Sequence, residues 1–387
     1  MKSSHSRRLG PRVNARMLFL LIAAVYITGF FSHALYLKKT VYGDGIFYYS
    51  WLRSAVVDRD ADFENEYRFF RVSQPQTPSG IPGNKYSIGP AMLWSPAYLT
   101  LRAIVRGTGY EFIYQLAIGV MSVLYALTGL VLLYRTLLRF FNRRIVSLTV
   151  IGIALATNLL FYGSVDAVNS HALSFFAASL FLTLVTESGI NRYAIGAVLG
   201  LIGLIRPQDL IYAVLLLPIA DKRVWRSLVA AAAVFLPQVA AWQIVYGSVL
   251  VHPYFLSGES FQFTRPHIAG VLFSGTNGLL LWSPILVFSL IGFLSHFGKS
   301  DRWRYPLLAV LCISIVVVAS WSTWWQGASY GGRMFVSYLP IFAIGLGNFL
   351  TRVSWRERIG ERLLWGGMSL FVLLNVFLLP VFLLSSP

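Results

Sequence analysis

Long apolar segments recur along the chain and constrain its fold more than any other feature. Eleven are apolar enough to enter a bilayer: 17–37, 112–134, 145–163, 170–186, 193–205, 207–220, 227–246, 279–297, 305–320, 334–350 and 363–385. In lipid the backbone polar groups must be satisfied internally, and a helix needs about 20 residues to cross the roughly 30 Å hydrocarbon core. The sequence therefore predicts an all-α polytopic membrane protein with about eleven transmembrane helices, organised as a single membrane domain over residues 1–387.

The composition excludes several other classes of protein. Only 12% of the residues are charged, against roughly 25% in an ordinary soluble domain. The net charge of +17 falls in short clusters between apolar segments rather than on one basic face, so we expect membrane lipids as partners and no nucleic acid. The single cysteine, Cys312, excludes an intramolecular disulfide, a cysteine-based zinc site and a CxxC redox motif.

The basic clusters predict the orientation of the chain. With the N-terminus inside, the inner segments hold 20 basic and five acidic residues, whereas the outer segments hold 12 basic and ten acidic residues. The inner basic residues are Lys2, Arg7, Arg8, Arg12, Arg16, Arg135, Arg139, Arg143, Arg144, Arg192, Lys222, Arg223, Arg226, Lys299, Arg302, Arg304, Arg352, Arg356, Arg358 and Arg362. Because Lys and Arg favour cytoplasmic loops, we expect a cytoplasmic N-terminus. The first segment, 17–37, runs on through Ser32 and Ala34, which favours an uncleaved anchor over a signal peptide.

The same charge pattern places residues 86–101. This apolar segment contains Pro90 and Pro96, and a crossing there would move the basic residues between 135 and 144 to the outer side. We therefore expect an interfacial or re-entrant helix.

Residues 193–220 are expected to form two short arms rather than one long helix. A single helix would place the basic residues between 222 and 226 outside, so we expect a break at Arg206-Pro207-Gln208-Asp209. Each arm would reach only about 20 Å, short of the bilayer core, so that Arg206 and Asp209 would lie low and line a cavity. A buried arginine there would pair with Asp209 or with a ligand anion.

Three polar segments are then left on the outer face, where we expect function to reside. They are the long first loop, 38–111, the second loop, 247–278, and the short aromatic stretch 321–333. Transmembrane helices two to seven occupy residues 112–246, and helices eight to eleven occupy residues 279–387.

The first loop opens with Asp44 between two glycines, Gly43 and Gly45, followed by an aromatic run. Asp44 stands where a helix would begin, so one interpretation is an N-cap beside an aromatic belt. The other interpretation is catalytic, because flanking glycines leave a carboxylate open to close approach at the depth of a lipid headgroup.

Five carboxylates follow at alternate positions between residues 58 and 66. An extended strand would align them on one side. A calcium-binding loop would need glycine at its sixth position, where Phe63 stands, and glutamate at its twelfth, where Phe69 stands. The alternatives are a solvated acidic turn and a role for Asp60 and Asp62 in shaping an acceptor site.

Single cations mark the remaining outer segments. Lys85 precedes the interfacial helix and would either meet a lipid phosphate or anchor that helix by snorkelling. The second loop contributes Arg265, beside His252 and His267, neither of which has metal-ligand spacing. The aromatic stretch ends at Arg333, after tryptophans that can stack on a sugar or on lipid and glycines that allow close backbone approach.

Three motifs in this arrangement resemble the GT-C superfamily of polyprenyl-phosphate-sugar-dependent glycosyltransferases. The resemblance is to the branch of the protein O-mannosyltransferases and the lipid A aminoarabinose transferase, and it covers most of the chain in layout. The motifs are Gly43-Asp44-Gly45 with Tyr48 and Tyr49, Asn84-Lys85-Tyr86-Ser87-Ile88-Gly89-Pro90, and Trp324-Trp325-Gln326-Gly327 with Ser329-Tyr330-Gly331-Gly332-Arg333. Members of that branch usually follow the aspartate with Glu or Asp, whereas here Gly45 follows Asp44.

The resemblance implies an inverting transfer of a sugar, on the outer face, from a polyprenyl-phosphate donor to a glycan, lipid or protein acceptor. It implies that Asp44 is the general base and that the lipid phosphate is bound by Lys85, Arg206, Arg333 and, less directly, Arg265. The sugar or acceptor would contact Tyr48, Tyr86, Trp325, Gln326, Tyr330, Asp60 and Asp62. No metal is required, a divalent ion has no clear site, and the expected location is a bacterial inner membrane with the site facing outward.

Two other functional classes remain open at this point. A transporter or flippase of lipid or lipid-linked sugar would place ionisable residues or broken helices near mid-membrane in paired halves, whereas the break at Arg206 is unpaired. A non-catalytic scaffold of a cell-envelope assembly is the third reading, and it requires that Asp44 be only an N-cap.

Overall fold

Helices make up the computed structural model, which describes residues 14–295, 297–355 and 361–385. Six helices in these ranges are long and apolar enough to cross a membrane. They correspond to α1 (Ala15–Leu37), α5 (Phe112–Leu137), α9 (Val224–Tyr246), α13 (Arg304–Ser320), α14 (Leu339–Trp355) and α15 (Glu361–Ser385), and the spans of α13 and α14 begin earlier, at Asp301 and Arg333. Lys2, Arg7, Arg8, Arg12, Arg356 and Arg358 lie outside the described residues.

Shorter elements complete the helical bundle and its ends. They are α2 (Gly45–Arg53), η1 (Ser54–Asp58), α3 (Glu64–Phe70), α4 (Gly89–Ile104), α6 (Arg143–Leu155), η2 (Phe161–Val165), α7 (His171–Thr186), α8 (Arg192–Ile205), η3 (Pro207–Ile219), η4 (Pro253–Ser257), α10 (Ile268–Phe273), α11 (Leu279–Trp282), α12 (Ile285–Phe293), η5 (Gly298–Trp303) and η6 (Arg333–Tyr338). No β-strand occurs within the described ranges, only two isolated bridges.

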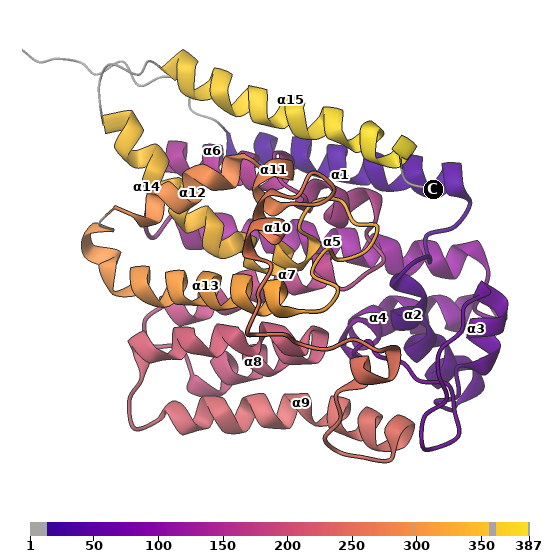
Figure 1. Ribbon diagram of the computed structural model, residues 1–387. Helices are drawn as coiled ribbons and strands as arrows, with labels where there is room; N and C mark the ends of the chain where they lie inside the picture. The colour runs from indigo at the N-terminus through magenta and orange to yellow at the C-terminus, as the bar shows by residue number, and fades with distance from the viewer. Residues whose placement is uncertain (1–13, 296, 356–360, 386–387) are drawn as a thin grey trace, which may run out of the picture.

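The long helices run roughly side by side, and α2, α3 and α4 gather at one end of the bundle, at the right of Figure 1. Close packing within the bundle uses small residues. A side chain at Gly196 or Gly200 of α8 would lie within 2.4 Å of the backbone carbonyls of Ser227 and Ala231 in α9. This small-x-x-x-small spacing lets two helices approach at backbone contact, as is common in membrane proteins.

The break expected at residue 206 is present, but the second arm has a different conformation from the one expected. α8 ends at Ile205, Arg206 is extended, and η3 is a 3-10 helix of 13 residues. A 3-10 helix rises about 2.0 Å per residue, so this arm spans about 26 Å instead of about 20 Å. Pro218 removes a backbone donor that a regular α-helix would use, whereas Pro207 stands at the first position of η3, where no such donor is needed.

Two other apolar segments are also interrupted near the same end of the bundle. The segment 145–163 ends its α-helix at Leu155 and continues through η2, which is a π-type turn. The segment 279–297 is divided into α11 and α12 at Ser283-Pro284. The carboxylates between residues 58 and 66 do not form an extended strand: Asp58 ends η1, residues 64–66 begin α3, and the residues between them bend the chain.

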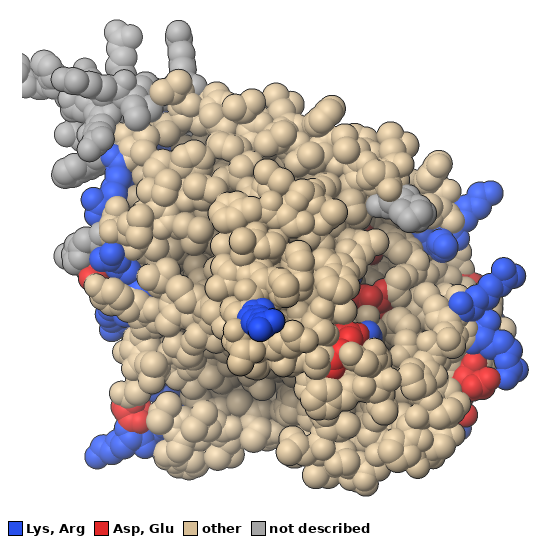
Figure 2. Space-filling view, in the orientation of Figure 1, with Lys and Arg blue, Asp and Glu red and all other residues tan. Residues whose placement is uncertain are grey.

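Charged side chains are concentrated at two opposite edges of the molecule (Figure 2). Between these edges lies a broad band of mostly uncharged atoms, in which Figure 2 shows one basic side chain at the surface and acidic atoms inside a hollow. The band fits a protein embedded in lipid, in which charges avoid the hydrocarbon region.

Candidate active site

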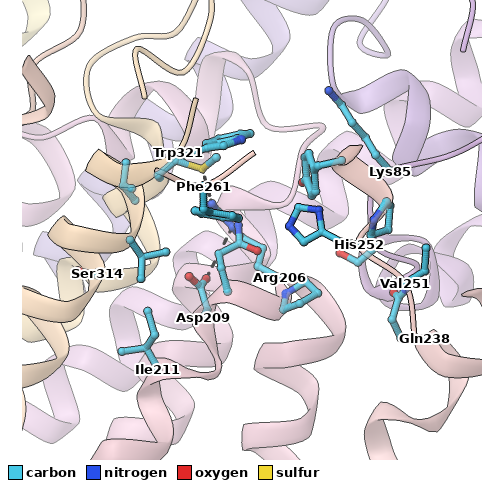
Figure 3. Close-up of a pocket in the computed structure, with 18 of the residues that line it drawn as sticks. Lys85, Arg206, Asp209, Ile211, Gln238, Val251, His252, Phe261, Ser314 and Trp321 are labelled. Atoms are coloured by element: carbon cyan, nitrogen blue, oxygen red, sulfur yellow. Dashed lines mark hydrogen bonds and ion pairs between the residues drawn. The ribbon is translucent and has the colours of Figure 1, made fainter. Parts of the chain in front are cut away.

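Two adjoining cavities open between the first loop, the second loop, the aromatic stretch and the ends of the helices. One is about 200 Å³, is largely polar and contains Asp44. The other is about 400 Å³ and is lined mostly by apolar side chains from η3, α9, α13 and the second loop. Both cavities share Tyr48, Lys85, Arg206, Gln208, Tyr254, Trp321 and Met334. Figure 3 shows the apolar cavity, with Arg206 in its middle beside Asp209 and Lys85 at its edge.

Asp44 uses its carboxylate for contacts inside the polar cavity rather than to cap a helix. It stands at the N-terminus of α2, but its side chain makes no capping hydrogen bond. The Tyr86 hydroxyl donates to its Oδ1 at 2.7 Å, and the Arg333 guanidinium lies 3.0 Å from its Oδ2. The N-cap interpretation of Asp44 is therefore wrong, and a reactive position in the cavity remains.

Backbone packing fixes Asp44 in this position. Gly43 has a φ of +52°, a conformation that favours glycine, and it turns the chain into α2. A Cβ on Gly45 would lie 2.3 Å from the carbonyl oxygen of Val168, so only glycine fits there. The start of α2 is thus held against the segment that precedes α7.

Arg206 is buried at the break between α8 and η3, where the two cavities meet. Its Nε lies 3.7 Å from the Asp209 carboxylate, and its Nη1 contacts His171 Nδ1 at 2.8 Å. A guanidinium only donates, so His171 accepts at Nδ1. Asp209 in turn accepts a hydrogen bond of 3.0 Å from the Tyr338 hydroxyl. The expected pairing of Arg206 with Asp209 is present, and the same side chain also faces both cavities.

Lys85 lies across the cavity from Arg206 and is paired with Glu259 of the second loop. The other carboxylate oxygen of Glu259 accepts from the Thr323 hydroxyl at 3.2 Å. The Lys85 ammonium also lies 5.4 Å from the centre of the Tyr254 ring. Lys85 is therefore a cavity residue with a protein anion as its partner, not a snorkelling anchor.

The start of α4 brings Lys85 close to Arg206. The Ser87 hydroxyl donates to the carbonyl of Ile205, the last residue of α8. The Ile88 amide donates to the Gln238 side chain at 2.9 Å, and a Cβ on Gly89 would meet the carbonyl oxygen of Leu204 at 2.3 Å. Contacts to α8 and α9 thus fix the position of residues 84–90, at the start of α4.

The aromatic stretch 321–333 contributes some of its residues to the cavity and others to the core. Trp325 is 46% exposed and lines the polar cavity, as does the buried Gln326, whose side chain accepts from the Met334 amide at 3.0 Å. Tyr330 does not line it: this ring is fully buried, stacks on Phe161 and donates to Asn375. The expected contact of Tyr330 with the sugar is wrong, because this side chain packs in the core.

Three further candidates lie away from both cavities. Asp60 accepts from the Ser54 hydroxyl at 2.6 Å, and Asp62 accepts from the backbone amide of Glu64 at 3.0 Å at the start of α3. The acidic run is therefore a turn whose carboxylates accept hydrogen bonds from neighbouring residues of the same loop. Arg265 is exposed on the second loop and is not among the cavity residues. Within the described part of the chain, no group of three or more His, Cys, Asp or Glu residues is arranged to hold a metal ion.

No family model and no curated protein matches this sequence, but solved structures match its fold. The Cupriavidus metallidurans ArnT structure in the apo state aligns with a TM-score of 0.55 at 15% identity, over 91% of this chain and 61% of that chain. The form bound to undecaprenyl phosphate aligns with a TM-score of 0.57, over 91% of this chain and 62% of that chain at 15% identity. The chain has a GT-C fold.

A second GT-C protein aligns over a similar range. The Archaeoglobus fulgidus oligosaccharyltransferase AglB, in complex with an inhibitory peptide and a dolichol-phosphate, matches with a TM-score of 0.55 at 12% identity. The alignment covers 94% of this chain and 54% of that one. The chain thus spans about three fifths, or slightly more than half, of the length of these GT-C proteins.

Within the GT-C fold, the packing at Gly45 explains the departure from the Asp-Glu or Asp-Asp pattern. The carbonyl of Val168 occupies the space that a second acidic side chain would need. A carboxylate is supplied nearby by Asp166, just before α7. The pKa of Asp166 is raised to about 7, mainly by burial and also by the charge of Asp44, while the hydrogen bond from Tyr42 and the charge of Arg333 oppose the rise.

Sequence reasoning missed His171, Gln208 and Tyr254, and it gave no role to Asp166 or Glu259. Each of these residues stands alone in the sequence, without a motif or a metal-ligand spacing. Their places depend on the break at Arg206 and on the fold of the second loop. The only signal in the sequence that could have pointed to such residues is a polar side chain near the end of an apolar segment.

Proposed function

We propose that this protein is a membrane glycosyltransferase that moves a sugar from a polyprenyl-phosphate donor to an acceptor. The observation that carries the proposal is the junction of the two cavities. An apolar cavity of about 400 Å³ meets a polar one that holds Asp44, and Lys85 and Arg206 lie where they meet. A lipid-phosphate sugar has the same order of parts, with an apolar chain, an anionic link and a polar ring.

In this proposal the isoprenoid chain enters the apolar cavity. Trp242, Ile211, Phe261 and Val318 supply apolar surface there, and apolar surface removed from water stabilises binding by about 25 cal/mol per Å². Lys85 and Arg206 face the lipid phosphate, since charge-assisted hydrogen bonds are the strong contacts to such a group. The bound undecaprenyl phosphate and dolichol-phosphate of the two GT-C neighbours support a lipid-phosphate ligand.

The reaction proposed is a single inverting displacement. The acceptor hydroxyl donates its proton to the Asp44 carboxylate while its oxygen bonds to the anomeric carbon of the sugar. The bond between that carbon and the phosphate oxygen breaks, and its electron pair leaves with the lipid phosphate. The sugar ring develops positive charge in the transition state, and the departing phosphate becomes more negative.

Arg333 and Tyr86 have two roles in this scheme. Their contacts to Asp44, at 3.0 and 2.7 Å, hold the carboxylate in one orientation before the acceptor arrives. A carboxylate has about four acceptor positions, so a substrate hydroxyl still has access to Asp44. As negative charge moves to the phosphate, the cation of Arg333 also stabilises the departing group. The sugar is held by Tyr48, Trp325 and Gln326, which line the polar cavity.

We further propose that the site faces the outer side of a bacterial inner membrane, with the N-terminus in the cytoplasm and about eleven membrane crossings. The excess of basic residues in the segments assigned to the inside supports this orientation. The scheme requires no metal, because a lipid monophosphate leaving group carries less charge than a nucleotide diphosphate, and Lys85, Arg206 and Arg333 supply cations.

The proposal is tested by Asp44→Asn in membranes from a deletion strain, which contain the unidentified acceptor. Labelled polyprenyl-phosphate sugars are added as donors, and transfer of label to acceptor is measured. The variant should fold, bind the donor and lose transfer by a factor of about 100 to 10,000, the usual contribution of a general base. Asp62→Asn, at the exposed turn away from the cavities, is the matched control and should retain full transfer. Unchanged transfer by Asp44→Asn would contradict the proposal.

A further inference from the structure

Every cation of the candidate site already has a carboxylate partner. The pairs are Lys85 with Glu259, Arg206 with Asp209, and Arg333 with Asp44. The three positive and three negative side chains balance one another. A donor phosphate that enters this site therefore adds an uncompensated negative charge unless one carboxylate gives up its cation.

The three carboxylates differ in how firmly they are held. Asp209 is completely buried and is also bonded to Tyr338, so it is fixed in the core. Asp44 is held by the rigid start of α2. Glu259 instead lies in the second loop, directly after Gly258, which has a φ of +74° and no atom within 4 Å of a Cβ position. The Glu259 side chain also has one more rotatable bond than an aspartate, so its carboxylate can turn away from Lys85 while the backbone stays in place.

We infer that Glu259 occupies the phosphate position on Lys85 in the empty protein and is exchanged for the phosphate of the donor. The inference rests on the proposed function and makes Glu259 a positioning residue. While the site is empty, Glu259 neutralises Lys85 and keeps it pointed into the cavity. When the lipid phosphate arrives, it takes over the ammonium group and the Glu259 side chain rotates away, while the backbone beside it stays paired with the aromatic stretch.

The contacts of Glu259 connect this exchange to the base. Its second oxygen accepts from Thr323, and the adjoining residues pair with the aromatic stretch. The Ser322 amide donates to the Ser260 carbonyl at 2.8 Å, and the Gln262 amide donates to the Ser320 carbonyl at 2.6 Å. The same stretch continues to Gln326 and Arg333. Release of Glu259 therefore loosens the segment that carries the partner of Asp44, and donor binding is communicated to the acceptor side.

Removing the charge of Glu259 gives a distinctive kinetic pattern. Glu259→Gln keeps the shape of the side chain but no longer competes for Lys85. Donor and lipid-phosphate product should both bind more tightly, so KM for the donor falls. Turnover should also fall, because the product leaves more slowly. A purely structural role for Glu259 would weaken binding instead.

The test measures binding of farnesyl phosphate, a lipid phosphate without a sugar, to the purified full chain in nanodiscs. Glu259→Gln should bind about fivefold more tightly than the unaltered protein, as expected when a competing ion pair of about 1 kcal/mol is removed. Thr323→Val, which frees Glu259 without changing charge, should bind about twofold more tightly. Glu64→Gln, which removes an exposed carboxylate paired with Arg68, should leave the affinity unchanged.

A double-mutant cycle assigns the effect to Lys85. In a Lys85→Gln background, Glu259→Gln should no longer change the affinity. If farnesyl phosphate binds and Lys85→Gln weakens it, but neither Glu259→Gln nor Thr323→Val tightens it, the exchange is refuted and the proposed function stands. If the unaltered protein binds no lipid phosphate and transfers no sugar, the proposed function fails, and the exchange fails with it.

Discussion

Gly45 links the position of the base to a single backbone contact, and Gly45→Ala perturbs that contact alone. The added Cβ would lie 2.3 Å from the Val168 carbonyl oxygen, whereas real contacts of this kind rarely fall below 3.0 Å, a difference of 0.7 Å. The obstructing atom belongs to the backbone, so it cannot rotate away as a side chain would. The start of α2 and the segment before α7 must separate by at least this distance.

The displacement predicts a loss of both stability and activity. Overpacking of this kind costs about 1–3 kcal/mol. Asp44 is the neighbouring residue, and a misplacement of about 1 Å can lower a catalysed rate about 100-fold. We therefore expect Gly45→Ala to lower transfer by about 10- to 100-fold at a temperature where the protein stays folded. Gly45→Asp restores the residue pattern of the related branch, yet it should be no more active than Gly45→Ala.

Two measurements on each variant check this prediction. Transfer is measured with a labelled polyprenyl-phosphate sugar, and the melting temperature is measured on purified protein in detergent. Gly367→Ala in α15 is the matched control, because its Cβ would meet nothing within 4 Å. It should keep full transfer and gain about 0.5–1 kcal/mol from reduced chain entropy. Full transfer and an unchanged melting temperature in Gly45→Ala would refute the packing that we describe at Asp44.

Further variants address the partners of Asp44 and its acidic neighbour. Tyr86→Phe removes the hydrogen bond to Asp44. Initial rates should show a kcat lowered about tenfold or more, with little change in the KM for the donor. An unchanged kcat would argue that Tyr86 does not orient Asp44. Arg333→Gln leaves Asp44 without its cation and should lower kcat/KM by a factor of 30 or more, at roughly 2 kcal/mol or above, with Arg333→Lys in between. Folding raises the pKa of Asp166 from 3.8 to about 7, so between these values the folded protein keeps a proton that the unfolded chain has lost. The melting temperature should therefore fall from pH 5 to pH 7 and stay level above pH 7. Asp166→Asn should reduce that decline without abolishing it, because burial also raises the pKa of Glu66 to about 7, and a decline of the same size in this variant would exclude Asp166 as a source.

The positions of the helices were largely predictable from the sequence. Each of the eleven apolar segments contains a helical element, because hydropathy summed over many residues determines which parts of a chain can enter lipid. The break at Arg206 was also predicted, since Pro207 and the charge pattern both require it. The 3-10 conformation of η3 and the early end of α6 at Leu155 were not, because both depend on packing with neighbouring helices. That all eleven segments cross the membrane stays a prediction.

The candidate site was predictable only where a motif surrounds the residue. Asp44, Lys85 and Arg333 stand in recognisable patterns, and the structure brings all three to the polar cavity with Arg206. Asp60 and Asp62 belong to a conspicuous acidic run, but their side chains form hydrogen bonds within their own turn rather than at the cavity. Tyr330 was assigned because it belongs to the third motif of the family resemblance, but its side chain is buried in the core.

Partners from distant parts of the chain could not be predicted. Lys85 and Glu259 are 174 positions apart, and no local pattern relates them. The same is true of Arg206 and His171, which meet only because α7 begins at the level of the bundle where α8 ends. Sequence patterns report what neighbouring residues share, whereas ion pairs across a bundle depend on how its helices are arranged.

The most direct test of the central claim is a measurement of lipid-linked sugars in a deletion strain by mass spectrometry. The native donor and acceptor are both present in such cells, so neither has to be identified beforehand. The account predicts that a polyprenyl-phosphate sugar accumulates while one glycan is lost. The unaltered gene should restore both to normal, and the Asp44→Asn gene should restore neither. Unchanged lipid-linked sugars and glycans in the deletion strain, or full restoration by Asp44→Asn, would contradict the assignment.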